Sequence, residues 1–190
     1  MHYSSPFGPR ERLLDAVDEL LDSASINGMG VDAIVRHSGA ARKSLYRHFK
    51  SKDELFSTVL QRRSERWIAW FECSTLARSI VVSEQLVGMF DVLCDWLHRD
   101  GLNGCALLNA AAEMRNTCRE IKLVTRAHSA RLLEFVERLC IASGATNTHA
   151  LARQLLVLLD GAITLAMVEG NADAATDAKE VARALVAGTA

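Results

Sequence analysis

The segment spanning residues 32–53 constrains the fold of this chain more than any other stretch. Its first part has an apolar helical face that ends at Gly39, and glycine readily takes the left-handed backbone conformation that closes a helix. A second short helix is predicted from Ser44 to Phe49, because Leu45 and Phe49 are four residues apart and share one side. The segment therefore predicts two short helices that are joined by a tight turn and packed on each other.

This segment is also locally basic. No acidic residue lies between its terminal aspartates, whereas these cationic side chains do: Arg36, Arg42, Lys43, Arg47, Lys50 and Lys52. A helix that enters the DNA major groove has to tolerate the phosphates on either side and donate hydrogen bonds to base edges. The pattern therefore predicts a helix-turn-helix DNA-binding unit. The alternative interpretation is a solvated basic surface beside an ordinary helix pair.

The residues that carry this pattern closely resemble the N-terminal domain of TetR/AcrR-type transcriptional regulators. The matching positions are Val31, Ile34, Gly39, Ser44, Leu45, Tyr46, His48, Phe49, Lys52 and Leu55. The resemblance covers roughly residues 1–60. It implies an all-helical homodimer whose N-terminal domains bind a double-stranded DNA operator and whose C-terminal domains bind a small-molecule inducer.

We expect the second of the two short helices to make most of the DNA contacts. Phosphate contacts are predicted for Tyr46, His48 and Lys52, and contacts at or near base edges for Arg42, Lys43, Ser44 and Arg47. Several positions depart from the family pattern. Met29 and Gly30 replace two hydroxyl residues, and Ala41 replaces a serine that would cap the second helix. Lys43 occupies a position often held by glycine, and we expect its charge to raise the general affinity for phosphate.

The rest of the chain also favours helices. It contains two prolines in 190 residues and no sustained alternation of apolar and polar positions. Leu13, Leu14 and Val17 predict a first helix that braces the DNA-binding pair, with an acidic outer face turned away from DNA. We therefore expect an all-α fold with an N-terminal three-helix helix-turn-helix domain at 1–52 and a C-terminal ligand-binding and dimerisation domain at 53–190. Because the formal net charge is −1, affinity for nucleic acid must come from a local patch.

A long connecting helix is predicted to begin at Ser51, because Ser51 and Glu54 have the spacing of a capping box. Its apolar positions continue to Phe71. Arg62, Arg63 and their basic neighbour lie in the middle of this helix. We interpret Arg62, Arg63 and Arg66 as a solvated stripe that pairs with Glu65 and neighbouring acids.

The five cysteines are spread over separate segments and include no C-x-x-C pair, which indicates a reducing compartment. No signal peptide is recognisable, and no uninterrupted apolar stretch reaches the roughly 20 residues of a membrane helix. These observations predict a cytoplasmic protein without membrane association. Cys94 and His98 could form half of a metal site, but no second pair is visible, so we expect neither a metal nor another cofactor.

A ligand chamber is predicted in the C-terminal domain. Its apolar walls would be formed by Trp67, Trp70, Phe71, Phe90, Trp96 and Met114. Its polar contacts would come from Asn109, Glu113, Arg115 or His128. An ordinary aromatic core is the alternative interpretation of the same residues.

Cys105 lies in a segment, residues 104–113, that resembles a Gly-Cys-x-Leu-x-Asn-x-x-x-Glu pattern found in some C-terminal domains of the same family. With Asn103 as a helix cap, its thiol would lie in the first helical turn, where the helix dipole favours the thiolate. We therefore consider Cys105 both as a ligand-contacting residue and as a sensor of electrophiles or oxidants. A buried, inert cysteine is the alternative.

Two final helices are expected at about 147–169 and 173–187. Leucines of the first occupy more than one of its sides, and a monomer would leave some of them exposed. Such a helix pair can meet its twofold mate in a four-helix bundle, so we predict a homodimer through the last two helices. The alternative is that the leucines fill the inner core.

These features predict a ligand-responsive DNA-binding transcriptional regulator. Its simplest form is a repressor that a small apolar or electrophilic inducer releases from a palindromic operator. The dimer would place two recognition helices in successive major grooves, about 34 Å apart. The alternatives are a helical adaptor that binds an acidic protein, and a thiol-dependent enzyme using Cys105 and His128. No recognisable nucleophile and base support an enzyme, so catalysis is not expected.

Overall fold

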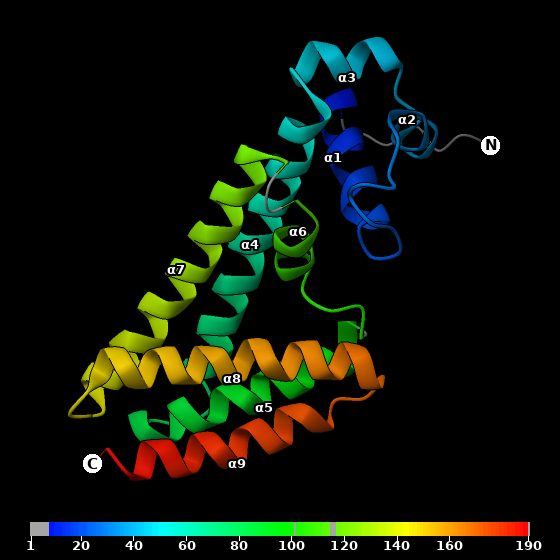
Figure 1. The fold of residues 1–190 in the computed structure, drawn as a ribbon. Coiled ribbons are helices and arrows are strands. Elements are labelled where there is room, and N and C mark those ends of the chain that lie inside the picture. The colour runs from blue at the N-terminus through cyan, green and yellow to red at the C-terminus, as the bar shows by residue number, and fades with distance from the viewer. Residues whose placement is uncertain (1–7, 101, 115–116, 190) are drawn as a thin grey trace. The chain divides into compact units, whose positions relative to one another are not determined.

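The computed structural model describes residues 8–100, 102–114 and 117–189, and helices make up all the regular secondary structure of these residues. The helices are α1 (Pro9–Leu20), α2 (Val31–Ser38), α3 (Arg42–His48), α4 (Lys52–Leu76), α5 (Val82–Asp100), α6 (Ala106–Met114), α7 (Arg119–Ala142), α8 (Thr148–Glu169) and α9 (Asp173–Ala187) (Figure 1). This order confirms the predicted all-α class and the three short helices at the N-terminus. The final two helices have the predicted bounds to within one residue.

The chain packs as two units. The first comprises residues 1–65 and 106–127, and the second comprises residues 66–105 and 128–190. The long helices α4 and α7 each contribute one part to either unit. This division describes packing, so the predicted functional boundary between residues 52 and 53 stays a prediction.

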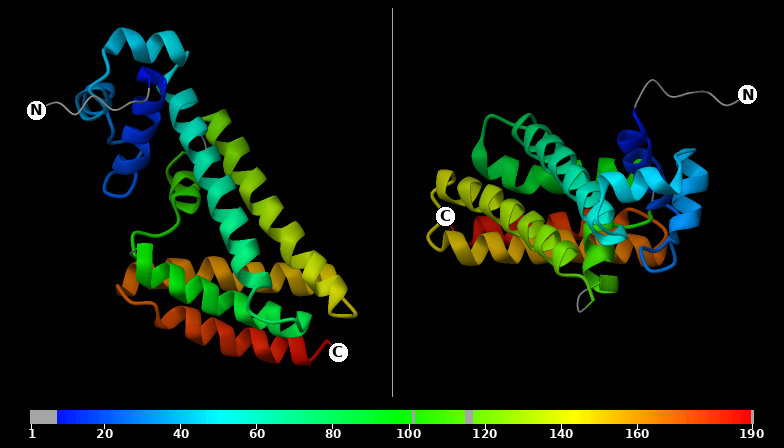
Figure 2. Two further views of the ribbon diagram at one scale, coloured as in Figure 1. Left: turned by 180° about the vertical axis from the view of Figure 1, so that it is seen from behind. Right: turned by 90° about the horizontal axis from the view of Figure 1, so that it is seen from above.

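In the first unit, α1, α2 and α3 pack on one another, as both views in Figure 2 show. Leu13 of α1, Ile34 of α2 and Leu45 of α3 are fully buried between them. Gly39 closes α2 with a φ of 61°, the left-handed conformation predicted for it. Helix α3 begins two residues earlier than the sequence suggested, and Phe49 follows it in an extended conformation while still being buried.

The acidic side of α1 is used for packing in a way that the sequence did not predict. Arg62 of α4 donates to both carboxylate oxygens of Glu11, at 2.8 and 3.1 Å. Arg63 donates to Asp18 and, at 2.8 Å, to Asp22. Arg62 and Arg63 therefore do not form the solvated stripe with Glu65 that the sequence predicted. They join the connecting helix to the helix that braces the DNA-binding pair.

The start of α4 confirms the predicted capping arrangement. The hydroxyl of Ser51 accepts a hydrogen bond from the N–H of Glu54 at 3.1 Å. The carboxylate of Glu54 reaches back one residue further than in a standard capping box and accepts from the N–H of Lys50 at 2.6 Å. These bonds fix the chain between α3 and α4. They therefore help to orient α3, which is too short to be stable by itself.

In the second unit, α5, α8 and α9 lie side by side, as Figures 1 and 2 show. The side of α9 that faces its neighbours carries small residues, which allow close approach: Ala174, Ala175, Ala178 and Ala182. Leu151, Leu155 and Leu159 of α8 are buried on the matching side. The predicted helix hairpin is thereby confirmed within one chain.

Two titratable groups in the second unit lie in poorly hydrated places. Burial, with a smaller effect from Arg131, lowers the pKa of His128 to about 4. Burial raises the pKa of Asp160 on α8 to about 6. His128 is therefore neutral near pH 7, whereas Asp160 is ionised at a cost to the stability of the fold.

We predict that Asp160→Asn stabilises the protein at pH 8 and has little effect near pH 4. The folded-state pKa of Asp160 lies above its unfolded value, so the destabilisation by its carboxylate is present above about pH 6 and disappears as the group becomes protonated. Thermal unfolding followed by circular dichroism between pH 4 and 8 measures the difference. Asp177→Asn, at an exposed position of α9, is the matched control. Equal melting temperatures of wild type and Asp160→Asn at pH 8 would contradict the prediction.

Candidate functional site

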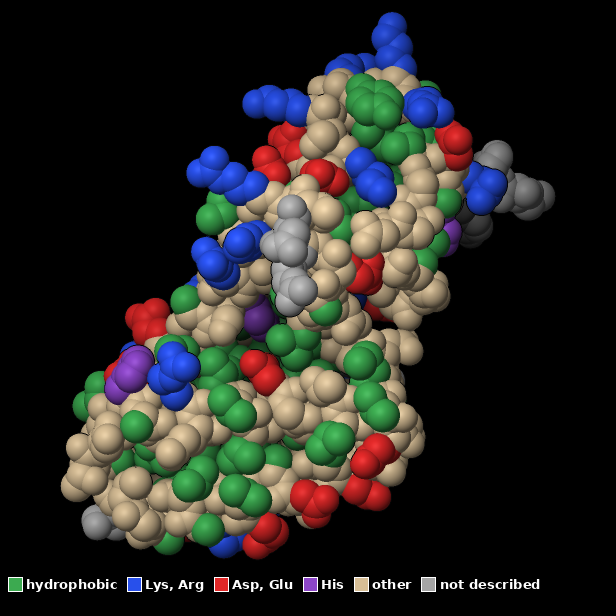
Figure 3. Space-filling model, in the orientation of Figure 1, with side chains coloured by type: hydrophobic (Ala, Val, Ile, Leu, Met, Phe, Trp, Pro, Cys, Tyr) green, Lys and Arg blue, Asp and Glu red, His purple; other side chains and the backbone are tan. Residues whose placement is uncertain are grey.

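Helix α3 has one buried side and an otherwise exposed cationic surface. Leu45 is fully buried, and Phe49, four residues later, is buried with it. The residues predicted to contact DNA on this helix occupy the remaining sides: Arg42, Lys43, Tyr46 and Arg47 are exposed, and Ser44 and His48 are partly exposed. Figure 3 shows Lys and Arg side chains projecting from the surface around α3. The geometry therefore matches what a helix needs in order to enter a DNA groove.

The cations of α3 are largely available to a partner. Arg42 forms an ion pair with Asp32 at 2.8 Å, and both side chains are mostly exposed, so this pair contributes at most about 1 kcal/mol. In the described part of the chain, no carboxylate lies within ion-pairing distance of Lys43 or Arg47. A phosphate can therefore bind these groups with little competition.

The helix starts confirm the departures noticed in the sequence. Ala41 is the N-cap residue of α3 and Gly30 that of α2, and neither start has a side-chain capping bond. Met29, which stands where the resemblance led us to expect a hydroxyl residue, is 2% exposed and fills the core. The two short helices consequently rely on packing more than on capping for their position.

Lys52 makes contacts that the sequence did not predict. Its ammonium group donates to the backbone carbonyl of Ile26 at 3.4 Å and to that of Met29 at 3.1 Å. It also lies 5.4 Å from the centre of the Phe56 ring. Lys52 therefore holds the loop between α1 and α2 against α4, and its phosphate contact stays a prediction. His48 is half-buried, and its Nε2 atom has no hydrogen-bond partner among the described residues.

Glu113 of α6 also reaches this loop. Its Oε2 atom accepts a hydrogen bond from the backbone N–H of Asn27 at 3.2 Å. The sequence had placed Glu113 in the ligand chamber, and nothing in local periodicity relates two residues that are 86 positions apart. The loop that precedes the DNA-binding helices is thus held by Lys52 from α4 and by Glu113 from α6.

Several residues predicted for the ligand chamber do come together in the second unit. The ring of Trp67 stacks on Phe71 with centroids 4.7 Å apart, and it meets the edge of Trp96 at 5.8 Å. Trp70 lies 6.2 Å away and His128 5.7 Å away. The result is one aromatic cluster built from α4, α5 and α7.

Two buried polar atoms of α4, one of them in this cluster, have no hydrogen-bond partner among the described residues. The indole N–H of Trp67 is buried and has no hydrogen-bond partner among the described residues. The same holds for the hydroxyl of Thr75, two turns further along α4, whose residue is fully buried. Buried groups of this kind destabilise a protein by about 1–3 kcal/mol each unless something satisfies them.

The other predicted chamber residues are placed differently. Phe90 is fully buried in α5, whereas Asn109, Glu113 and Met114 belong to α6 in the first unit. Arg115 lies outside the described residues. Cys105 is 8% exposed and directly precedes α6, which begins at Ala106, so its thiol is not inside the first helical turn.

The pair considered as half of a metal site makes a local contact instead. The ring Nδ1 of His98 lies 3.6 Å from the sulfur of Cys94 and 2.9 Å from the carbonyl oxygen of Cys94. Within the ranges that the structure describes, His, Cys, Asp and Glu form no group of three that could hold a metal ion.

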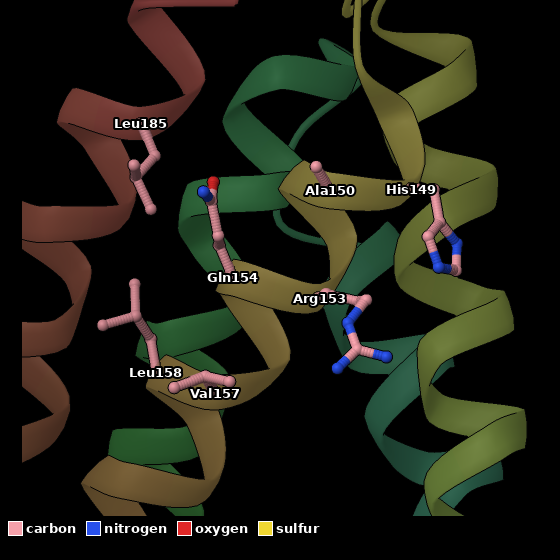
Figure 4. A pocket seen from close by; sticks show the side chains of 7 residues that line it. All are labelled: His149, Ala150, Arg153, Gln154, Val157, Leu158 and Leu185. Atoms are coloured by element: carbon pink, nitrogen blue, oxygen red, sulfur yellow. The ribbon is translucent and has the colours of Figure 1, made fainter.

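An apolar surface covers the outer side of α8 and α9, where Figure 3 shows hydrophobic side chains gathered. The largest exposed residues on it are Val157, Leu165, Val168 and Val181, with Val157 and Val168 69% and 73% exposed. A groove of about 600 Å³ runs along this surface (Figure 4). It is lined by His149, Ala150, Arg153, Gln154, Val157, Leu158 and Leu185.

Helix α8 is also long and apolar enough to cross a membrane by length and composition, although the sequence predicted no membrane helix. Arg153 and Asp160 interrupt its apolar residues, so the sequence contains no uninterrupted apolar stretch at this helix. The core helix of a soluble protein meets the same criteria, and the buried side of α8 packs on α5 and α9.

Comparisons with known proteins agree with this geometry. Residues 13–59 match the family model of bacterial regulatory proteins of the tetR family. The chain is 24% identical over 131 residues to the HTH-type transcriptional activator FasR of Mycolicibacterium smegmatis; the match covers 68% of this chain but only 59% of FasR.

Solved structures of TetR-family regulators extend the similarity to the C-terminal helices. A regulator from Streptomyces coelicolor has a TM-score of 0.85 at 25% identity and covers 95% of both chains. One from Streptomyces avermitilis has a TM-score of 0.80 at 26% identity, over 93% of this chain and 98% of its own. The reduced form of NemR from E. coli, at 14% identity, shares the fold with a TM-score of 0.81 over 93% of this chain and 97% of its own. Residues 13–59 therefore have the DNA-binding domain of bacterial regulatory proteins of the tetR family, and the chain as a whole shares the fold of TetR-family transcriptional regulators.

Proposed function

We propose that this DNA-binding regulator acts as a homodimer on a palindromic operator and that a small molecule changes its affinity for that operator. The observation that carries the proposal is the exposed cationic surface of α3, on which Lys43 and Arg47 have no ion-pair partner among the described residues and which the burial of Leu45 holds outward. Residues 1–52 would read DNA, and residues 53–190 would bind the ligand and form the dimer. Selection of bound duplexes from a random pool, followed by a ligand screen for release, tests the whole proposal.

We propose repression as the direction of control, because a dimer that is released by its ligand most simply acts by blocking a promoter. FasR is named an activator, and this name favours activation as a second candidate. In vitro transcription from a promoter that contains the selected operator separates them. A repressor lowers the transcript yield, and an activator raises it.

The alternatives from the sequence are weaker. Regulators of this family are transcription factors and not enzymes, so a thiol-dependent activity of Cys105 with His128 is set aside. An adaptor would use the α3 cations on an acidic protein, and retention of the pure protein on mixed genomic DNA at moderate salt would argue against it. A cytoplasmic location is the corresponding proposal for a regulator that meets DNA.

We predict that Tyr46→Ala and Lys43→Gln weaken binding to the operator and to random duplexes by similar factors. Lys43→Gln should also reduce the slope of log affinity against log salt by about 1, because a cation that neutralises a phosphate is lost, whereas Tyr46→Ala should leave the slope unchanged because its hydroxyl is neutral. Arg47→Gln should instead cost about 1–3 kcal/mol on the operator and relax the preference at one base position. Fluorescence anisotropy at several salt concentrations measures all three.

Arg138→Gln is the control for these variants, because it removes an exposed cation from α7 in the other unit. Its salt slope should equal that of the wild type. Unchanged operator affinity in both Tyr46→Ala and Lys43→Gln would refute the assignment of α3 as the recognition helix.

The apolar surface of α8 and α9 supports the dimer. Gly161 lies in the middle of α8, where glycine costs about 1 kcal/mol relative to alanine. A Cβ atom at Gly161 would meet nothing within 4 Å in the single chain, so packing inside the chain does not require a glycine there. Close approach of a second α8 helix would require it. Val157 and Val168 flank this glycine on the same side of the helix.

We predict that Val157→Glu converts the dimer into monomers and thereby lowers operator affinity, because a carboxylate would be buried between the two copies. Sedimentation velocity at micromolar concentration measures the oligomeric state. Ile80→Glu is the control, since Ile80 is 99% exposed in the connection between α4 and α5. A Val157→Glu protein that remains dimeric would exclude this surface as the interface.

For the ligand, we propose the aromatic cluster around Trp67 as the binding site. A small apolar molecule with a hydrogen-bond acceptor would satisfy the indole N–H of Trp67 or the hydroxyl of Thr75. The neutral imidazole of His128 lies beside the same rings. An electrophilic inducer would act through Cys105 instead.

We predict that alkylation with N-ethylmaleimide lowers the operator affinity of the wild type but not that of Cys105→Ser, if Cys105 is the sensor thiol. Its 8% exposure predicts slower modification than that of the exposed Cys73, because the reagent must wait for local opening. Mass spectrometry quantifies modification at each site. A dimer that is fully modified at Cys105 and still binds its operator as tightly would end the sensor hypothesis.

A further inference from the structure

A groove between α6 and α7 lies in the same unit as the DNA-binding helices and apart from the residues of the Trp67 cluster. Its volume is about 350 Å³. It is lined by Ala110, Ala111, Met114, Ile121, Lys122, Thr125 and Arg126. Of these, only Met114 was considered for ligand binding from the sequence.

The groove is apolar on one side and cationic on the other. Ala110 and Ile121 are fully buried and Met114 is nearly so, which makes an apolar floor. Lys122 and Arg126 are exposed on α7 and lie four residues apart, so they share one face of that helix. The floor and the two cations together form an amphipathic cavity.

The positive charge of Lys122 and Arg126 is not neutralised by other described residues. In the described residues, no carboxylate lies within ion-pairing distance of Lys122 or Arg126, and α7 carries no acidic residue between Glu120 and Glu134. Like charges four residues apart on a helix repel each other and are slightly destabilising. Solvated cations are common on helices, but two unpaired ones beside an apolar hollow are complementary to a ligand with an anionic head and an apolar body.

We propose that this groove binds an amphipathic anion, with a carboxylate or phosphate held by Lys122 and Arg126 and an apolar group packed on Ala110, Met114 and Ile121. The charged groups would form charge-assisted hydrogen bonds, and the apolar group would cover the partly exposed Ala111 and the small exposed part of Met114. Binding of the anion to this groove does not depend on the proposed function. The effect of that binding on DNA affinity rests on the proposed function.

The α6 wall of the groove is joined to the loop that precedes the DNA-binding helices, and the α7 wall lies near the start of α4. Helix α6 holds the α1–α2 loop through Glu113, which accepts the hydrogen bond from Asn27. Helix α7 follows directly on Cys118, and Asp53 at the start of α4 is close enough to raise the pKa of this thiol, after burial itself. A ligand that binds more tightly when α6 is displaced from α7 would therefore weaken the Glu113 contact and release the loop.

The test uses octanoate as the probe, titrated calorimetrically into the full-length protein. We expect octanoate to bind at least about tenfold more tightly than octan-1-ol, which lacks the charge, and than acetate, which lacks the apolar chain. The double variant Lys122→Gln/Arg126→Gln should lose at least about tenfold in octanoate affinity. Arg119→Gln, an exposed cation of α7 that does not line the groove, should leave it unchanged.

Ala111→Trp provides a second variant that keeps both cations but fills the groove, and it should also lose octanoate binding. Circular dichroism confirms that each variant is folded. Octanoate binding that is equal in wild type and the double variant, or octan-1-ol binding as tight as that of octanoate, would overturn the site.

Operator release is measured separately by anisotropy with the selected duplex. Release by octanoate in the wild type, but not in Lys122→Gln/Arg126→Gln, supports the coupling through α6, and binding without release refutes it. If no duplex is selected at all, the proposed function fails while the calorimetric result stands. If a duplex is bound and octanoate is not, only the groove proposal fails.

Discussion

The burial of Leu45 is the interaction on which the DNA-binding surface depends. Helix α3 has seven residues, and isolated helices shorter than about 12–15 residues are marginal in water. Without a side-chain cap at Ala41, its position is set by Leu45 in the core, by Phe49 at its end and by the capping bonds that begin α4. A helix anchored along one side presents its other sides outward, and here those sides carry the cations.

The cations of the first unit differ in whether the protein itself supplies them with partners. Arg62 and Arg63 are held by the acids of α1, and the hydrogen bonds from Arg62 lower the pKa of Glu11. Lys52 is held by backbone carbonyls. These contacts build the support, and they leave Lys43 and Arg47 as positive charge that the chain does not neutralise itself. A chain with a net charge of −1 can therefore still bind a polyanion.

Local signals in the sequence were sufficient to predict the helices and the exposed cationic residues of α3. Gly39, the Leu45–Phe49 spacing and the Ser51–Glu54 box each act within a few residues, so periodicity and capping rules reveal them. The bonds from Lys52 to the α1–α2 loop and from Glu113 to Asn27 join residues that are 23 to 86 positions apart, and no local pattern records such pairs. The groove beside Lys122 was missed for the same reason. The aromatic cluster was predictable as a set of residues but not in its ring geometry.

The α1–α2 loop is where small changes could have large consequences for DNA binding. It leads directly into the DNA-binding helices, and the contacts that hold it from outside come from α4 and α6. A partly solvated hydrogen bond such as that of Glu113 contributes about 0.5–1.5 kcal/mol. Coupling free energies between allosteric sites are typically about 1–3 kcal/mol. The loss of one such contact in each copy of the proposed homodimer is therefore comparable to a typical allosteric coupling, and no large rearrangement of the core is needed to supply it.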